Sequence, residues 1–375
     1  MALFQREKNT YRIEIDLGFN SNGKRKRIYE TFNGSKKEAK ARESEIKNQV
    51  KSGLYVDNNN LTYEMFINKW LKDYAEPTLA PKTLSVYKAR TNDIIKQLGS
   101  IKIKNLRPLH LIEFYNHLRD REKPKKLSPK TIRHYYMLNN TILNHAIKWQ
   151  IITNNPNEKI DRPKVYKKEA QYYDVEQTKS LLKCLEKENP KYRALILLTL
   201  DTGARRGEIT GLEWSDIDFE KGIVTINKTT QYVDNKIIEK LPKNESSRRK
   251  VYITKVTIEA LKQHKIELDS LKKKTGNKWK DSNKVFTSNE GGLIHPDTAS
   301  KIFGKILKKY NLPKISFHSL RHTSVSLLIA SGIHTQVISK RVGHSSASTT
   351  QNIYSHVFES VASEVTDKMN DILTQ

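Results

Sequence analysis

Two polar stretches divide the 375-residue chain into three parts that differ in hydrophobic patterning. Residues 51–60 contain Gly53 and three consecutive asparagines, and residues 161–170 combine Pro163 with several basic side chains. We interpret both stretches as linkers between separate domains. At roughly 100–200 residues per domain, the length allows two or three domains. We expect them at residues 1–55, 61–160 and 170–375.

The first part has the pattern of a small sheet and a helix. Residues 11–16 alternate apolar and charged side chains, which is the period of a half-buried strand. Ser-Asn-Gly at residues 21–23 indicates a turn into a second extended run over 24–32. Ser35, with Glu38 three residues later, forms a capping box that predicts a helix start. The expected order is therefore strand, strand and helix.

The middle part has helical periodicity throughout. Ser128 followed by Pro129 is typical of a helix start, with an N-cap and then a proline at the first helical position. The helix after it carries one apolar face, made of Ile132, Tyr135, Leu138, Ile142, Ala146 and Trp149. This stripe indicates the core of an all-α bundle rather than a cofactor site.

The third part mixes helices and strands. We expect helices at about 175–188, 191–202 and 256–274, strands at 223–229 and 251–253, and helices again from about residue 295 onward. The last of these helices carries an apolar stripe at helical spacing, made of Val357, Val361, Val365, Met369 and Ile372. Periodicity alone leaves open whether this stripe packs on its own domain or on a neighbouring protomer.

Basic residues far outnumber acidic ones. The formal net charge is +27, a balance that favours binding to nucleic acid, although a lysine-rich composition can also reflect an AT-rich genome. No apolar run is long enough to cross a membrane, and the N-terminus has no apolar leader segment. The single cysteine, Cys184, rules out a disulfide framework. We therefore expect a cytoplasmic protein.

Two groups of basic side chains are candidate DNA contacts. Lys24, Arg25, Lys26 and Arg27 follow the predicted turn and are either a solvated surface run or a ribbon that grips phosphates. Lys130 and Arg133 lie opposite the apolar stripe of the middle part and could contact a DNA backbone.

Five short motifs occur in the last two-fifths of the chain. They are Thr-Gly-Ala-Arg-Arg-Gly-Glu at 202–208, Leu-Pro-Lys-Asn at 241–244, His-Ser-Leu-Arg-His at 318–322, Val-Gly-His-Ser at 342–345, and Thr-Thr-Gln-Asn-Ile-Tyr at 349–354. Each is weak alone. His318 and His322 have the i, i+4 spacing of metal ligands on a helix, but no acidic or thiolate partner is nearby. We expect no metal site.

Together and in this order, the five motifs resemble the tyrosine site-specific recombinases, also called phage-type integrases. The three-part layout resembles the integrases of temperate phages and conjugative elements of low-GC bacteria. The resemblance covers essentially the whole chain and is strongest over about 170–360. It implies a multidomain α+β fold with an arm-type DNA-binding domain, a SAM-like helical core-binding domain, and a mainly α catalytic domain with a small antiparallel sheet, the DNA breaking-rejoining enzyme fold.

The resemblance also implies the site residues. The catalytic set falls on Arg205, Lys243, His318, Arg321, His344 and Tyr354, and Glu208 matches the acidic residue that supports the site. Lys240 is an alternative to Lys243, and Arg206 is an alternative to Arg205.

The implied reaction is cleavage and rejoining of DNA through a 3′-phosphotyrosyl intermediate and a Holliday junction, which integrates and excises a mobile element or prophage. No metal or ATP is implied, in keeping with the absence of a Walker motif from the sequence. The implied partners are double-stranded DNA at core and arm sites, three further copies joined through the C-terminal helix, an excisionase, and a DNA-bending host factor.

Three alternatives stay open. A chromosome-dimer resolvase would use the same chemistry, although the extra basic N-terminal part argues against it. A type IB topoisomerase would share the residue types in a different layout. A DNA-binding protein that kept the scaffold without its chemistry would have no need for Tyr354.

Overall fold

The computed structural model describes residues 2–19, 25–51, 60–122, 126–166, 171–240, 248–343 and 373–374. Contacts divide the chain into two units, Met1–Tyr166 and Lys167–Gln375. Within the first unit, the sheet-containing part and the helical part have separate hydrophobic cores. The three domain boundaries given above stay a prediction. Among the helices described, none is both long and apolar enough to span a membrane.

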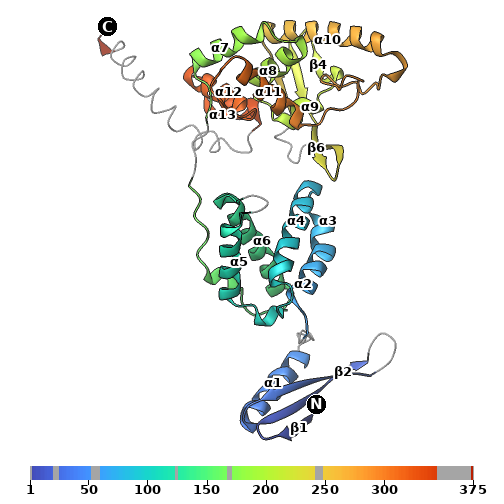
Figure 1. Cartoon of the computed structure of the whole chain (residues 1–375), viewed down its shortest axis with the longest axis vertical. Coiled ribbons are helices and arrows are strands. Elements are labelled where there is room, and N and C mark those ends of the chain that lie inside the picture. The colour runs from blue at the N-terminus through green and yellow to red at the C-terminus, as the bar shows by residue number, and fades with distance from the viewer. Residues whose placement is uncertain are drawn as a thin grey trace. The chain divides into compact units, whose positions relative to one another are not determined.

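A three-stranded antiparallel sheet with one helix on its face forms the N-terminal part (Figure 1). The elements are β1 (Ala2–Glu7), β2 (Thr10–Phe19), β3 (Arg25–Asn33) and α1 (Lys36–Lys51), with β2 in the centre of the sheet. Ile13 and Ile15 of β2 are fully buried with Ile46 of α1. The capping box is present, since the Ser35 backbone N donates to Glu38 Oε2 at 2.8 Å.

The expected order of two strands and a helix is wrong by one strand. β1 pairs along β2 and was not predicted, because residues 2–7 have no sustained alternation. Phe4 in this strand is half exposed, so its apolar character does not mark a buried face.

The second part of the first unit is all-helical, as predicted. Its elements are α2 (Tyr63–Trp70), the π-helical turn η1 (Leu71–Ala75), α3 (Glu76–Thr78), α4 (Pro81–Leu98), η2 (Ile103–Asn105), α5 (Pro108–Asp120), α6 (Pro129–Lys148) and η3 (Pro156–Lys159). Ser128 caps α6 by accepting a hydrogen bond from the Thr131 backbone N at 3.2 Å. The predicted apolar stripe of α6 packs into the core, and Trp149 at its end is partly buried.

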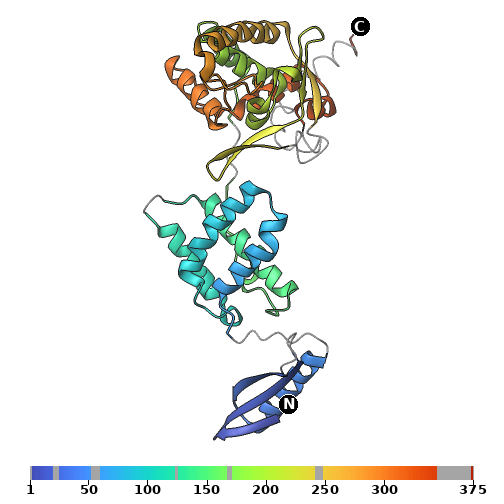
Figure 2. The ribbon, with the colours of Figure 1, turned by 90° about the vertical axis from the view of Figure 1, so that its right-hand side faces the viewer.

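The second unit surrounds a buried central helix, α8 (Figure 2). Its elements are α7 (Val175–Leu185), α8 (Pro190–Thr202), α9 (Arg206–Gly211), η4 (Trp214–Asp216), β4 (Ile217–Asp218), β5 (Ile223–Ile226), β6 (Thr229–Val233), β7 (Lys236–Lys240), β8 (Arg249–Tyr252), α10 (Lys255–Thr275), η6 (Gly276–Lys278), α11 (Asp297–Lys309), α12 (Ser319–Ala330) and α13 (Thr335–Val342). α8 packs against both α10 and α12. β4, β5 and β8 form one antiparallel sheet, and β6 and β7 form a separate hairpin.

One expected strand is divided in two. The run at 223–229 ends as β5 at Ile226, and the chain turns before β6 begins at Thr229. Asn227 lies in this turn and donates through Nδ2 to Asp216 Oδ1 at 3.0 Å. The β6–β7 hairpin then turns at Asp234 and Asn235, which both have positive φ, as a type I′ turn requires.

Candidate active site

Arg205 lies where α8 ends and α9 begins. Gly203 closes α8 in the left-handed conformation, with φ of 59°, and Arg205 is the N-cap residue of α9. A Cβ at Gly203 would lie 2.7 Å from Val342 Cγ1, so only glycine lets the chain pass this close to α13. Arg205 Nη2 donates to the Gly343 carbonyl at 3.0 Å, while 43% of its side chain stays exposed. The guanidinium is therefore fixed by the backbone, and its exposed part remains accessible to a ligand.

Glu208 holds the other side of this guanidinium. Its Oε1 accepts from Arg205 Nη1 at 3.0 Å, and its Oε2 accepts from the Arg205 backbone N at 2.9 Å. Oε2 also accepts from Arg249 Nη2 at 2.9 Å, and only 5% of the Glu208 side chain is exposed. Burial raises the pKa of the carboxyl, but the charges and hydrogen bonds of Arg249 and Arg205 outweigh it and hold the pKa below its ordinary value. Glu208 is thus charged at neutral pH.

Arg321, on α12, bonds backbone carbonyls next to the segments that position Arg205. Its Nη1 donates to the Gly203 carbonyl at 2.7 Å and to the Val342 carbonyl at 2.5 Å, and the residue is 3% exposed. The carbonyls of residues 342 and 343 therefore hold Arg321 and Arg205, respectively. The structure brings these two predicted residues together although they are far apart in the sequence.

His318 occupies the N-cap position of α12, one helical turn from Arg321. Its side chain is exposed, yet desolvation of the ring by the surrounding protein and the charges of Arg321, Arg205 and Arg206 lower its pKa. The ring is therefore uncharged at neutral pH. It meets His322 edge to face, with ring centroids 5.1 Å apart. Desolvation and the neighbouring His318 lower the pKa of His322 to about 4.

Three predicted catalytic residues, Lys243, His344 and Tyr354, lie outside the described residues. The alternatives to two assignments are described. Arg206 is engaged in an ion pair with Asp297 Oδ1 at 2.6 Å, which favours Arg205 as the site arginine. Lys240 is the last residue of β7, paired with Thr229 across the hairpin.

The predicted DNA contacts are only partly described. Lys24 lies outside the described residues, as do the side chains of Arg25 and Lys26. Arg27 pairs with Glu14 at 3.2 Å, so part of its charge is neutralised. Arg12, which the sequence analysis did not single out, lies on the face of the sheet opposite α1, with its guanidinium carbon 3.7 Å above the Tyr29 ring.

Lys130 and Arg133 lie on α6 outside its buried stripe, as predicted; Lys130 is exposed and Arg133 is partly buried. Arg90 of α4 adds a third positive charge near α6, where its Nη2 donates to His134 Nδ1 at 3.1 Å. Burial and the charges of Arg90, Lys130 and Arg133 lower the pKa of His134. This concentration of positive charge spans two helices, so sequence periodicity within α6 identified Lys130 and Arg133 but not Arg90.

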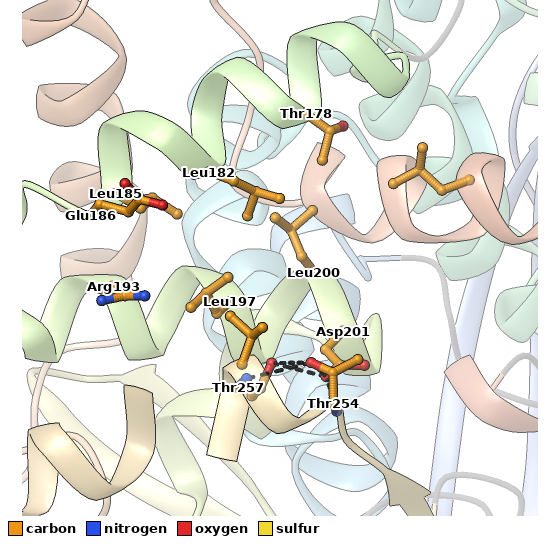
Figure 3. Close-up of a pocket in the computed structure, with 12 residues that line it drawn as sticks. Thr178, Leu182, Leu185, Glu186, Arg193, Leu197, Leu200, Asp201, Thr254 and Thr257 are labelled. Atoms are coloured by element: carbon orange, nitrogen blue, oxygen red, sulfur yellow. Dashed lines mark hydrogen bonds between the residues drawn. The ribbon is translucent and has the colours of Figure 1, made fainter. Parts of the chain in front are cut away.

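A pocket of about 530 Å³ opens on the second unit between α7, α8, α12 and the start of α10 (Figure 3). Its apolar lining is Leu182, Leu185, Leu197, Leu200, Val256 and Leu327. Asp201 at its edge accepts hydrogen bonds from the Thr254 backbone N at 2.7 Å and from Thr257 Oγ1 at 2.9 Å (Figure 3). Thr178, Glu186 and Arg193 also line the pocket, so its apolar surface is bordered by polar side chains.

Known proteins are similar to this chain in sequence and in fold. Residues 171–360 match the model of the phage integrase family, and residues 62–119 match that of the phage integrase N-terminal SAM-like domain. A "tyrosine recombinase XerC-like" protein of Caldanaerobacter subterraneus subsp. tengcongensis is 31% identical, over 97% of each chain. The "ICEBs1 integrase" of Bacillus subtilis is 23% identical, over the full length of both chains.

Among solved structures, the Tn1549 transposon integrase in complex with transposon right end DNA has a TM-score of 0.69 at 22% identity, over 82% of this chain and 99% of that one. A lambda integrase tetramer bound to a Holliday junction has a TM-score of 0.56 at 17% identity, over 92% and 96%. These likenesses confirm the fold. With its two matched domain models and a relative that is similar along the whole chain, the protein belongs to the phage integrase family, the tyrosine recombinases that cut and rejoin DNA.

Proposed function

We propose that this recombinase integrates and excises a mobile element, with Tyr354 as its nucleophile. The observation that carries the proposal is the pair of guanidiniums that the second unit holds on neighbouring backbone carbonyls. Arg205 and Arg321 come from different helices and are fixed on adjacent carbonyls of residues 342 and 343, directly before His344. Two such forks match the non-bridging oxygens of one phosphodiester.

The phenol oxygen of Tyr354 attacks the phosphorus, forming the Tyr–O–P bond as the bond from phosphorus to the 5′ oxygen breaks. A phenol has a pKa of about 10, so ionising it at pH 7 costs about 4 kcal/mol. The two arginines offset this cost by stabilising the charge of the pentacoordinate transition state. The products are a 3′-phosphotyrosyl enzyme and a free 5′-hydroxyl. Attack by the hydroxyl of a partner strand reverses the step and exchanges strands.

Proton transfer needs two further groups. The uncharged ring of His318 can donate a hydrogen bond to the phosphate or accept the phenol proton. Lys243 supplies the proton that the departing 5′ oxygen takes up, because an ammonium on a flexible stem can reach that atom. His344 is a second hydrogen-bond donor to the phosphate.

We assign the DNA contacts by charge. Lys130 and Arg133, together with Arg90, bind the backbone at the core site. Residues 24–27 and the exposed sheet face with Arg12 bind the arm site. Bases are read by contacts beyond these, since phosphate contacts position the protein without carrying sequence information.

Four protomers act together on two DNA sites in this proposal. The apolar stripe of residues 357–372 docks on a neighbouring protomer rather than on its own, and the pocket lined by Leu182, Leu197 and Val256 is its receptor. Five leucines and Val256 give the pocket an apolar surface that is large enough for several aliphatic side chains, which supports this assignment. The lambda integrase described as a tetramer on a Holliday junction has the same fold. In the cytoplasm, an excisionase and a DNA-bending host protein would determine whether the element is integrated or excised.

The test uses DNA that carries the element's own ends and its chromosomal target on two plasmids. We expect the chain to join them without metal or ATP, and Tyr354→Phe to bind the DNA without joining it. Joining by Tyr354→Phe would refute the mechanism. A different outcome is that the unmodified chain binds the DNA tightly without joining it, even with accessory proteins added. That result would favour a DNA-binding protein that kept the scaffold without its chemistry.

A chromosome-dimer resolvase is the second candidate, because one relative similar along the whole chain has a name of the Xer type. A resolvase recombines two identical chromosomal sites and needs no arm sites. Recombination of identical sites by a chain lacking residues 1–55, at the rate of the full chain, would favour this candidate.

A further inference from the structure

Arg249 begins β8, six residues after Lys243, and the proposed chemistry does not use it. It pairs with Ile226 across the sheet, yet only 6% of its side chain is exposed. An arginine is rarely so buried without a specific partner. The neighbouring Lys250 on the same strand is exposed.

The Arg249 guanidinium bonds two separate segments of the second unit. Its Nη2 donates to Glu208 Oε2 at 2.9 Å, and its Nε donates to the Arg341 carbonyl at 2.8 Å. Glu208 accepts from Arg205 through its other oxygen at 3.0 Å. One buried carboxylate therefore bridges two guanidiniums, one of which contacts the phosphate in the proposed mechanism.

Gly343 contacts both arginines of this arrangement, Arg249 and Arg205. Its φ is 71°, and a Cβ there would lie 2.8 Å from Arg249 Nη1, so the guanidinium packs directly against the backbone. The carbonyl of the same glycine accepts from Arg205 Nη2 at 3.0 Å. Arg205, Glu208, Arg249 and the end of α13 thus hold one another in place.

We propose that Arg249 is a positioning residue for strand cleavage. It keeps Glu208 aimed at Arg205, and it ties the start of β8 to the end of α13. The chain segments that carry Lys243 and His344 adjoin these two ends, so one side chain sets the anchor points for both. The inference rests on the function proposed above. Arg249 touches no reacting atom and acts through Glu208.

The test compares Arg249→Met, Arg249→Lys and the control Lys250→Met in the full chain. Lys250→Met removes one charge from the same strand on its exposed side. The readout is the rate of covalent complex formation on nicked core-site DNA between pH 5 and 8. We expect Arg249→Met to lower this rate about 100-fold at pH 7, with DNA affinity within threefold of the unmodified chain. Lys250→Met should stay within threefold in both measurements.

The pH profile separates positioning from general damage. Arg205 and Arg249 are the charged groups that act on Glu208, so losing Arg249 raises the pKa of this buried carboxyl. The rate of Arg249→Met should therefore fall at a higher pH than that of the unmodified chain. Arg249→Lys keeps a cation beside Glu208 and should restore much of the profile. Adding Glu208→Gln to Arg249→Met should remove the extra acid limb.

An Arg249→Met variant with an unchanged rate or an unchanged pH profile would overturn the inference. If that variant does not fold, Arg249→Gln, which keeps a hydrogen-bond donor without the charge, takes its place and must show the lower rate and the shifted profile. The acid limb of thermal unfolding provides a readout without DNA, and it too should move to higher pH in Arg249→Met. A shift in unfolding with no covalent complex in any variant would leave Arg249 linked to Glu208 and refute the proposed function instead.

Discussion

At the scale of single residues, the site depends on one buried carboxylate between two arginines. Glu208 and Arg249 are both almost fully buried, so each needs the other to offset the loss of hydration. A buried ion pair of this kind adds little net stability but is costly to break from one side. The pair therefore gives Arg205 a fixed orientation rather than extra stability.

Glu208→Gln should lower the free energy of unfolding by about 3 kcal/mol at pH 7, because it leaves the Arg249 charge buried without its counterion. The folded-state pKa of Glu208 is lowered, so its stabilisation is present above the unfolded-state pKa and is lost as the pH falls through the folded-state value. The difference between variant and unmodified chain should therefore shrink on acidification below about pH 4. Denaturant titrations across pH check this, with the exposed Glu176→Gln as a control that changes little.

Gly343→Ala should disrupt the site through the backbone. The positive φ and the contact with Arg249 make any Cβ unfavourable there, at about 1–3 kcal/mol. Cleavage should fall with stability, since this carbonyl also holds Arg205. The matched control is Gly304→Ala in α11, where a Cβ meets nothing within 4 Å and should stabilise the helix by about 0.5–1 kcal/mol. Equal effects of the two substitutions on cleavage would contradict this account.

At the scale of helices and strands, local patterns predict local structure. The capping box at Ser35 and the proline start of α6 each depend on a few neighbouring residues, and both predictions are confirmed. The family motifs located Arg205, Glu208, His318 and Arg321, which the structure brings into one region. No local pattern could find Arg249, because its partners lie 41 and 92 residues away. β1 was missed for a related reason, since its pairing with β2 rather than its own alternation defines it.

The pocket beside α7 gives a prediction about this helix. Leu182→Glu places a charge in the proposed receptor for the C-terminal stripe, so it should prevent assembly on paired sites while single sites are still cleaved. Val175→Glu is the control, because Val175 is exposed on the same helix and does not line the pocket. Sizing of the complexes on paired and single sites measures the difference. Normal assembly by Leu182→Glu would refute the receptor assignment.

At the scale of the whole molecule, charge governs affinity. With a formal net charge of +27, binding should weaken steeply between 50 and 200 mM salt, as phosphate contacts release counterions. Replacing Lys130 and Arg133 together by alanine should reduce the slope of log K against log salt by about 2. Replacing Lys179 on α7, which pairs with Glu176, should leave the slope unchanged. A flat salt response of the unmodified chain would contradict the charge argument.

The N-terminal part gives a second prediction at this scale. It has its own core, separate from that of the helical part, so the remaining chain should fold without it. Removal of residues 1–55 should leave core-site cleavage intact and impair integration between complete sites. Full integration by the shortened chain would refute the arm-site assignment.

The central claim is that one particular tyrosine, among the 17 in the chain, becomes joined to DNA. The most direct measurement traps the covalent complex on a nicked core site, digests the protein and identifies the DNA-linked peptide by mass spectrometry. We predict that the phosphodiester link is on Tyr354 and that Tyr354→Phe yields no linked peptide. A link to any other residue, or an undiminished link in Tyr354→Phe, would contradict the mechanism.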